Sequence, residues 1–398
     1  MSSTQVAVLA REFAVSPVPV DPAGLVDELR ELEVLKCVAE ARQARVAAAL
    51  ATQYDDRRSV ASQVALARRV SPHRGQQLLS LATVLARELP HTRAAFEAGR
   101  ISEWRAMIIA RETACLPLEH RQHVDEVVAG NAGELEGRGD REIANLVRKL
   151  AAQLDAASVA ARRRRAESER RISLRPAPDA MVYLTALLPV AQGVAVYAAL
   201  RQAAATAVGI GEAASPGQAM ADELVRRATG ASTATGQRVA VNVTMTAEAL
   251  LAHSDDPATL AEFGPVSAEL ARSLVADSLD AGHQVWLKRL FTEPGTGALI
   301  GMDSRARLFP KALAEFIGLR DQFCRNPWCS APIRHHDHVV SHEEGGQTSA
   351  ENGQGLCEAC NYTKQAPGWR ARPSPGERHT VTITTPTGHQ YRSTAPEP

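Results

Sequence analysis

The sequence predicts an α+β protein that is mostly α-helical, with a helical N-terminal region, an α+β middle region and a small cysteine-built module near the C-terminus. Alanine, leucine, valine and arginine dominate, and aromatic residues make up only 4% of the 398 residues. Such a composition is typical of soluble helical proteins. Apolar residues such as Leu25, Leu29 and Leu32 recur every three or four positions, as on the buried face of a helix. Four of the six cysteines stand in two close pairs late in the chain.

The first 171 residues divide into a loose N-terminal arm, residues 1–20, and a helical domain, residues 21–171. The arm has neither the basic start nor the long apolar run of a signal peptide. Successive helix signals mark the domain that follows. Ser71 and Pro72, for example, have the form of an N-cap followed by a proline in the first helical turn. We therefore expect a bundle of helices over this region.

A run of arginines closes the helical domain. The segment AARRRRAESERR has only two glutamates to offset its arginines. Two interpretations are open for it: contact with nucleic-acid phosphates, or the solvated end of a long helix. The candidate DNA-binding residues are Arg162, Arg163, Arg164 and Arg165.

Composition changes after Arg171, and we expect residues 172–309 to form an α+β scaffold without a catalytic group. The segment from 172 to 188 has the alternation and turn of a β-hairpin, and an apolar helix is expected over 190–208. Further strands are expected over 238–247 and, as a pair, over 283–302. The most apolar stretch is interrupted by Pro189 and is too short to cross a bilayer.

Residues 310–373 form a compact module with the chain's clearest chemical signal. Cys324 and Cys329 have four residues between them, and Cys357 and Cys360 have two. Two short knuckles of this kind supply the four thiolates that a structural Zn²⁺ ion binds in a tetrahedron. The alternatives are four unrelated reduced thiols or two disulfides, and the paired spacing favours zinc.

Between the cysteine pairs the chain carries Asp337-His338, then Gly345-Gly346 and then Asn352, and the second pair continues as C-N-x2-K. This order resembles the HNH endonucleases of the zinc-ribbon type. The flanking segments FPKALAEFIGLRDQFCRNPWC and APGW are similar to actinobacterial HNH-signature proteins that carry an N-terminal domain of unknown function, domain 222. The resemblance implies a ββα-metal element that holds a catalytic divalent ion, with the zinc held separately by Cys324, Cys329, Cys357 and Cys360.

Hydrolysis of a phosphodiester needs an activated water, stabilisation of charge at phosphorus and a stabilised leaving oxygen. A neutral imidazole serves the first need and a divalent ion the other two. In a strand, neighbours such as Asp337 and His338 point to opposite faces. By similarity to the family, Asp337 is a ligand of the catalytic metal, His338 is the general base, and Asn352 orients the loop that holds His338.

The third family position is often histidine, and here it is Asn361, just after the second knuckle, where a helix is expected to begin. An amide oxygen binds hard cations such as Mg²⁺ or Mn²⁺ better than softer metals. His335, His336 and His342 lie close enough in sequence to compensate, although a solvated strand and loop is the interpretation we favour for them. Lys364, on the same helical face as Asn361, is either a phosphate contact or an exposed lysine.

Residues 374–398 are expected to form a hairpin that turns at Pro386 to Gly388, followed by a frayed tail. Lysine plus arginine and aspartate plus glutamate both number 45, so any affinity for DNA has to come from local patches. Cys37 and Cys115 lie far apart and imply no disulfide framework, which fits the cytoplasm. The expected function is a metal-dependent DNA endonuclease; the alternative is a catalytically weakened zinc module that binds DNA or a protein. Homo-oligomerisation through the N-terminal helices is open, RNA is a weaker candidate partner, and no membrane partner is expected.

Overall fold

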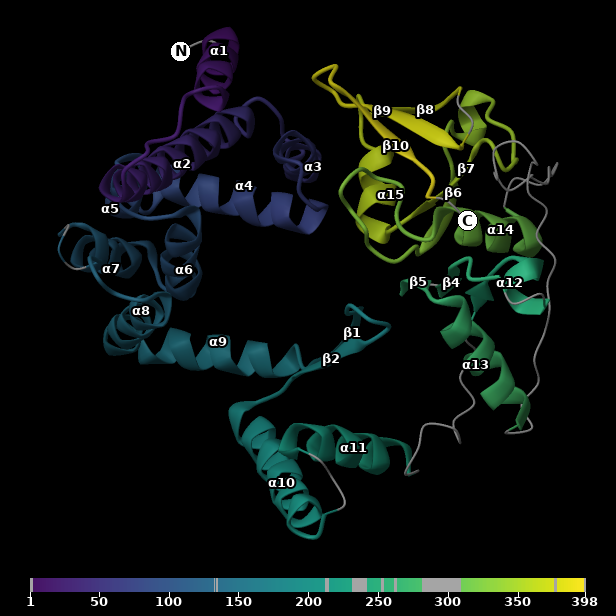
Figure 1. Cartoon of the computed structure of the whole chain (residues 1–398). Coiled ribbons are helices and arrows are strands. Elements are labelled where there is room, and N and C mark those ends of the chain that lie inside the picture. The colour runs from purple at the N-terminus through teal and green to yellow at the C-terminus, as the bar shows by residue number, and fades with distance from the viewer. Residues whose placement is uncertain are drawn as a thin grey trace. The chain divides into compact units, whose positions relative to one another are not determined.

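The computed structural model describes residues 3–131, 133, 135–211, 215–230, 242–251, 254–260, 263–280, 309–375 and 378–396 (Figure 1). The expected strand pair over 283–302 and the first half of the strand over 238–247 lie outside the described residues. The chain divides into two compact units: Met1–Ala65 with His73–Arg162, and Leu66–Pro72 with Arg163–Pro398.

Helices build the first unit, as the sequence predicts. Where the sequence predicts a loose arm, the structure has a helix with an exposed surface, α1 (Ser3–Ala14). Asp21 starts the long second helix because its side chain accepts a hydrogen bond from the Gly24 backbone N–H at 2.8 Å. The helices are α2 (Pro22–Leu50), α3 (Arg57–Arg68), α4 (Pro72–Arg87), α5 (Pro90–Glu97), α6 (Glu103–Thr113), α7 (Leu118–Ala129), α8 (Asp140–Leu154) and α9 (Ala156–Ser168).

The core of this unit lies between α2 and α4 through α8, around buried side chains such as Phe96, Ile109 and Val124. Leu89, at the start of α5, offers no side-chain cap. The fully buried carboxylate of Asp125 takes its place and accepts from the backbone N–H groups of His91 at 2.7 Å and Thr92 at 2.9 Å. A buried carboxylate from α7 therefore satisfies two helix-end donors that sequence reasoning leaves unpaired.

The middle of the chain opens with the predicted hairpin, β1 (Arg171–Pro176) and β2 (Val182–Leu187), which pair antiparallel. The predicted apolar helix follows as α10 (Val190–Gly209). The sequence does not predict the pairing of β4 and β5, because strands of three residues leave almost no periodic pattern. The remaining elements are α11 (Pro216–Thr229), β3 (Val243–Thr244), α12 (Ala247–Leu251), β4 (Ala258–Leu260), β5 (Gly264–Val266) and α13 (Ala268–Asp280).

The C-terminal module combines one two-stranded and one three-stranded sheet with two helices (Figure 1). The predicted hairpin is confirmed as β9 and β10, with Gly388 at φ +83° in its turn. A preceding strand, β8, is an addition to the predicted hairpin and gives the order β10-β9-β8. The elements are α14 (Lys311–Asp321), β6 (His335–His338), the 3-10 turn η3 (His342–Glu344), β7 (Gly353–Leu356), α15 (Glu358–Lys364), β8 (Arg370–Ser374), β9 (Thr380–Thr384) and β10 (Gln390–Thr394).

Among the described residues, no helix is both long enough and apolar enough to cross a membrane.

Candidate functional site

The site is built on a hairpin and the helix that follows it. Strands β6 and β7 pair antiparallel, with Asp337 opposite Gln354 and His338 opposite Gly353. A side chain at Gly353 has no room, because its Cβ would lie 2.9 Å from the ring of Phe309 and closer still to Ile317. The small residue lets α14 pack directly on the hairpin, and helix α15 completes a ββα element.

The four knuckle cysteines gather at one point, with their sulfurs all within 4.8 Å of one another. Cys329 Sγ is 3.7 Å from both Cys357 Sγ and Cys360 Sγ. Zinc–sulfur bonds of about 2.3 Å give a tetrahedron with edges of about 3.8 Å, whereas a disulfide needs about 2.05 Å. The cluster fits a structural zinc ion, and the disulfide alternative is wrong.

Asp337 and His338 point to opposite faces of β6, as the alternation of a strand requires. His338 is buried, its Nε2 lies 2.8 Å from Thr348 Oγ1, and its ring centroid is 4.5 Å from that of Phe309. Burial lowers the pKa of His338, so its imidazole is neutral at neutral pH. The sequence gives no sign of Thr348 or Phe309, because both approach His338 only through the tertiary fold.

Asn352 joins the two sides of the loop between β6 and β7. Its Nδ2 donates to the backbone carbonyls of Val340 at 3.0 Å and Gln347 at 2.8 Å, and its Oδ1 accepts from the Val340 N–H at 2.9 Å. Gly346 lies against this amide, because a Cβ there would be 2.6 Å from Asn352 Nδ2. The position of the loop beside His338 therefore depends on one buried amide and one glycine.

On the Asp337 face, the helix contributes a cation and an amide. Lys364 Nζ lies 2.5 Å from Asp337 Oδ2 and also donates to the His338 carbonyl. Its side chain is only 14% exposed, so in this structure it is not the exposed lysine that was one of the two interpretations. Asn361, which lies one turn inside α15 and not at its start, has a buried Oδ1 with no hydrogen-bond partner among the described residues.

The neighbouring histidines do not build a second metal cluster. Among the described residues, the four cysteines are the one group of three or more His, Cys, Asp or Glu side chains that could hold a metal ion. His342 lies against His338 with ring centroids 6.0 Å apart, and His335 is 6.4 Å from the Tyr362 ring. His336 is exposed on the strand. Of the candidate ligands on β6, Asp337 and His335 both contact α15, Asp337 through Lys364 and His335 through the Tyr362 ring.

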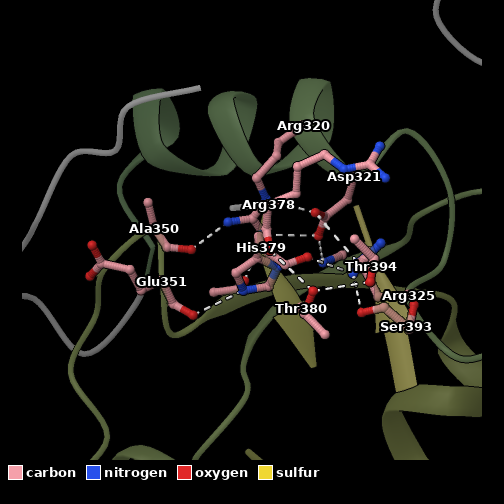
Figure 2. Close-up of polar contacts among 12 residues, drawn as sticks. Arg320, Asp321, Arg325, Ala350, Glu351, Arg378, His379, Thr380, Ser393 and Thr394 are labelled. Atoms are coloured by element: carbon pink, nitrogen blue, oxygen red, sulfur yellow. Dashed lines mark hydrogen bonds and ion pairs between the residues drawn. The ribbon is translucent and has the colours of Figure 1, made fainter. Parts of the chain in front are cut away.

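A buried charge network lies where α14 ends (Figure 2). The Asp321 carboxylate accepts from Arg320 Nε at 2.7 Å and from the Gly355 backbone N–H at 2.7 Å. Arg320 also donates to the carbonyls of Ala350 at 2.5 Å and Gly353 at 2.7 Å. These bonds tie α14 to β7 and to the segment that carries Asn352. A sequence pattern does not reveal them, because three of the groups are backbone N–H or C=O groups about thirty residues away along the chain.

The same network reaches the C-terminal sheet through Arg325 and His379. Arg325 Nη2 donates to the carbonyls of His379 at 3.1 Å and Ser393 at 2.7 Å. His379 Nε2 is 2.9 Å from the Glu351 carbonyl, and burial lowers the pKa of His379 to about 4, so the ring is neutral at neutral pH. The sheet is thus hydrogen-bonded to the hairpin module.

The arginine run lies on α9. Arg162 is drawn into the helical unit, where Nη1 donates to the Glu112 carbonyl at 3.1 Å and Nη2 is 3.3 Å from Glu112 Oε2. Arg163 is 3.5 Å from Glu167, and Arg164 and Arg165 are exposed. DNA contact by this run stays a prediction, and both Arg162 and Arg163 already have a carboxylate partner.

The fold and the site define a protein with an HNH-type ββα element beside a four-cysteine cluster. In agreement, residues 324–366 match the HNH endonuclease family, a domain that implies nuclease activity on a nucleic-acid substrate. Residues 26–321 match the family described as domain of unknown function 222, and because this match spans most of the chain, the protein belongs to that family. The predicted combination of these two domains is confirmed. No curated protein and no solved structure matches the chain.

Proposed function

We propose that the protein is a metal-dependent endonuclease that hydrolyses phosphodiester bonds of DNA, by nicking or cleavage. The observation that carries the proposal is the arrangement on β6. Asp337 and His338 leave the strand on opposite faces, the loop beside them is held by Asn352, and helix α15, which carries Asn361, contacts Asp337 through Lys364.

His338 is the proposed general base. Its pKa is lowered by burial, so the ring is ready to accept a proton at neutral pH. Because Nε2 is engaged with Thr348, Nδ1 is the nitrogen left to take a proton from the attacking water. Asn352 has a positioning role, since its three hydrogen bonds fix the loop and not the substrate.

Asp337 and Asn361 are the proposed ligands of a catalytic divalent ion. The fit rests on the buried Asn361 Oδ1, which lacks a hydrogen-bond partner among the described residues, and on the carboxylate that faces α15. Leaving a buried carbonyl oxygen unpaired costs about 1–3 kcal/mol, which a bound cation recovers. Two oxygen donors suit Mg²⁺ or Mn²⁺, and such an ion would stabilise negative charge on the phosphate.

Lys364 gives a first prediction, because its ammonium group already pairs with the carboxylate that would bind the ion. We expect Lys364→Met to bind Mn²⁺ about tenfold more tightly, since it removes one positive charge a few ångströms from the ion. Isothermal titration of Mn²⁺ into the zinc-loaded protein measures this directly. Lys311→Met, an exposed lysine on α14, is the matched control. Unchanged or weaker binding in Lys364→Met would show that the ammonium does not compete with the ion.

The proposed activity is tested with supercoiled plasmid. Purified zinc-loaded protein is incubated with Mg²⁺, Mn²⁺ or another divalent ion, and conversion to open-circular or linear DNA is followed on a gel. We expect conversion with at least one ion and none when added divalent ions are left out. Absence of conversion with every ion would overturn the proposal and favour the alternative, a zinc module that binds DNA or a protein without cutting it. A parallel RNA substrate decides between the two nucleic acids.

A further inference from the structure

The C-terminal sheet has two chemically different faces. Its three strands are in register, so that Ala371, Ile383 and Tyr391 form one row across the sheet. This face packs into a hydrophobic cluster with Val381 and Trp369. Because side chains alternate along a strand, every second residue must then lie on the opposite face.

The opposite face carries three arginines and no acidic residue. Arg372 and Arg392 both pair with Thr382, so they flank one threonine in a single row across the three strands. Arg370 lies two residues before Arg372, in the next row, opposite Thr384. The other side chains on this face are uncharged: Ser374, Thr380, Thr382, Thr384, Gln390 and Thr394.

These three arginines contribute little to the stability of the fold. All three are exposed, and among the described residues none of them forms an ion pair or a hydrogen bond through its side chain. Arg320 and Arg325 differ from these three, because they are buried and donate hydrogen bonds to backbone carbonyls of the C-terminal module. Guanidinium groups held on a rigid sheet without a protein partner are available to a ligand.

The spacing of the guanidinium groups suits a phosphate backbone. Residues two apart on a strand are about 6.6–6.8 Å apart, and positions across two strand spacings are about 9.5 Å apart. Positions this close let the long side chains of Arg370 and Arg372 reach neighbouring phosphates of one DNA backbone. Arginine binds phosphate oxygens in a bidentate manner, and the threonine hydroxyls between them add uncharged donors.

The position of the sheet places this face on the same module as the proposed active site. Strand β8 begins at Arg370, shortly after the end of α15 at Lys364, and Arg325 ties β9 and β10 to the module through the carbonyls of His379 and Ser393. In Figure 1 the sheet lies beside α15. The arginine face is thus the side of the sheet that faces away from the cluster of Val339, Trp369 and Val381, on the same C-terminal module as the proposed site.

We propose that the arginine face, made of Arg370, Arg372 and Arg392, binds the phosphate backbone of double-stranded DNA. The proposal rests on the proposed function for its choice of DNA and extends it to a surface outside the matched HNH residues 324–366. The proposal is supported by charge complementarity with the anionic backbone, because this face is cationic within a chain whose formal net charge is zero. Contacts of this kind give affinity and position and carry no sequence preference.

The test is duplex binding by the triple variant Arg370→Gln, Arg372→Gln, Arg392→Gln. Fluorescence anisotropy with a short duplex is recorded over a salt series without added divalent ion, so that no cutting is needed. Each lost phosphate contact lowers the slope of log K against log salt by about 0.9, so we expect the slope to fall by about 2–3. At low salt the affinity should fall at least tenfold.

Controls separate this face from general charge and from misfolding. Arg42→Gln, Arg87→Gln, Arg141→Gln removes three exposed arginines from the helical unit and should bind as the unaltered protein does. Zinc content and melting temperature should stay unchanged in both variants. An unchanged salt slope in the triple variant, or an equal loss in the control variant, overturns the proposal. Loss of RNA binding with duplex binding intact would overturn the choice of DNA. Because binding is measured without cutting, failure of the nicking assay leaves this test standing.

Discussion

His338→Ala is expected to abolish plasmid nicking while the protein keeps its zinc. A positioned general base contributes about 10²–10⁴-fold to a rate, so the residual activity should be at least a hundredfold lower. The gel assay described above, with initial rates at a saturating divalent ion concentration, measures the loss. The imidazole of His338 is buried, and among the described residues its one hydrogen-bond partner is Thr348. Its removal is therefore expected to leave the zinc cluster intact.

One further variant and a test of folding make this result specific. His342→Ala removes an exposed imidazole next to His338 and should leave the rate within about twofold of the unaltered protein. Zinc content by elemental analysis and the melting curve show whether His338→Ala is still folded. Nicking at an unaltered rate by a folded, zinc-loaded His338→Ala protein would falsify the assignment of the base.

Loss of zinc is expected to unfold the C-terminal module and leave the helical unit folded. The module's own hydrophobic clusters are small: one is formed by Leu313, Phe316, Ile317 and Ala350, and another consists largely of the cysteines themselves. Structural zinc sites supply about 10–16 kcal/mol of apparent binding free energy, which small cores of this size do not replace. Cys357→Ser removes one thiolate ligand but keeps a residue that can serve as the N-cap of α15.

We therefore expect Cys357→Ser to contain much less than one zinc per chain and to melt in two separated transitions. Circular dichroism should show that most of the helix signal survives the first transition, because the helical unit has a separate core. Cys115→Ser, a half-buried cysteine of the helical unit, is the control and should keep its zinc. A single transition at the unaltered temperature in Cys357→Ser would contradict a structural role for the metal.

The sequence predicts the parts of this protein that depend on local spacing. The two cysteine pairs, the Asp337-His338 step and the helical periodicity from Leu25 onward each have their signal within a few residues. The gathering of the four sulfurs and the pairing of β6 with β7 agree with those signals. Gly345 and Gly346 are also visible in the sequence, although the structure shows that Gly346 is needed for its contact with Asn352.

What the sequence does not predict depends on contacts between distant residues. Thr348 lies ten positions from His338, and no periodic pattern marks it as the partner of the imidazole. Asp125 caps a helix that begins more than thirty residues earlier. Strand β8 contains Pro373, a residue that argues against a strand, and it forms because β9 offers it a free edge. Lys364 turns inward because Asp337 lies opposite it, which spacing on one helix does not show.

The buried hydrogen-bond network at the end of α14 determines where the chain can be truncated without loss of the fold. A fragment that ended at residue 366, where the family match ends, would lack both carbonyl groups that accept hydrogen bonds from Arg325. The Arg325 guanidinium group would then lose these partners beside an apolar surface that the missing strands normally cover. The smallest fragment worth expressing therefore runs through β10, because the last strands are part of the folded C-terminal module.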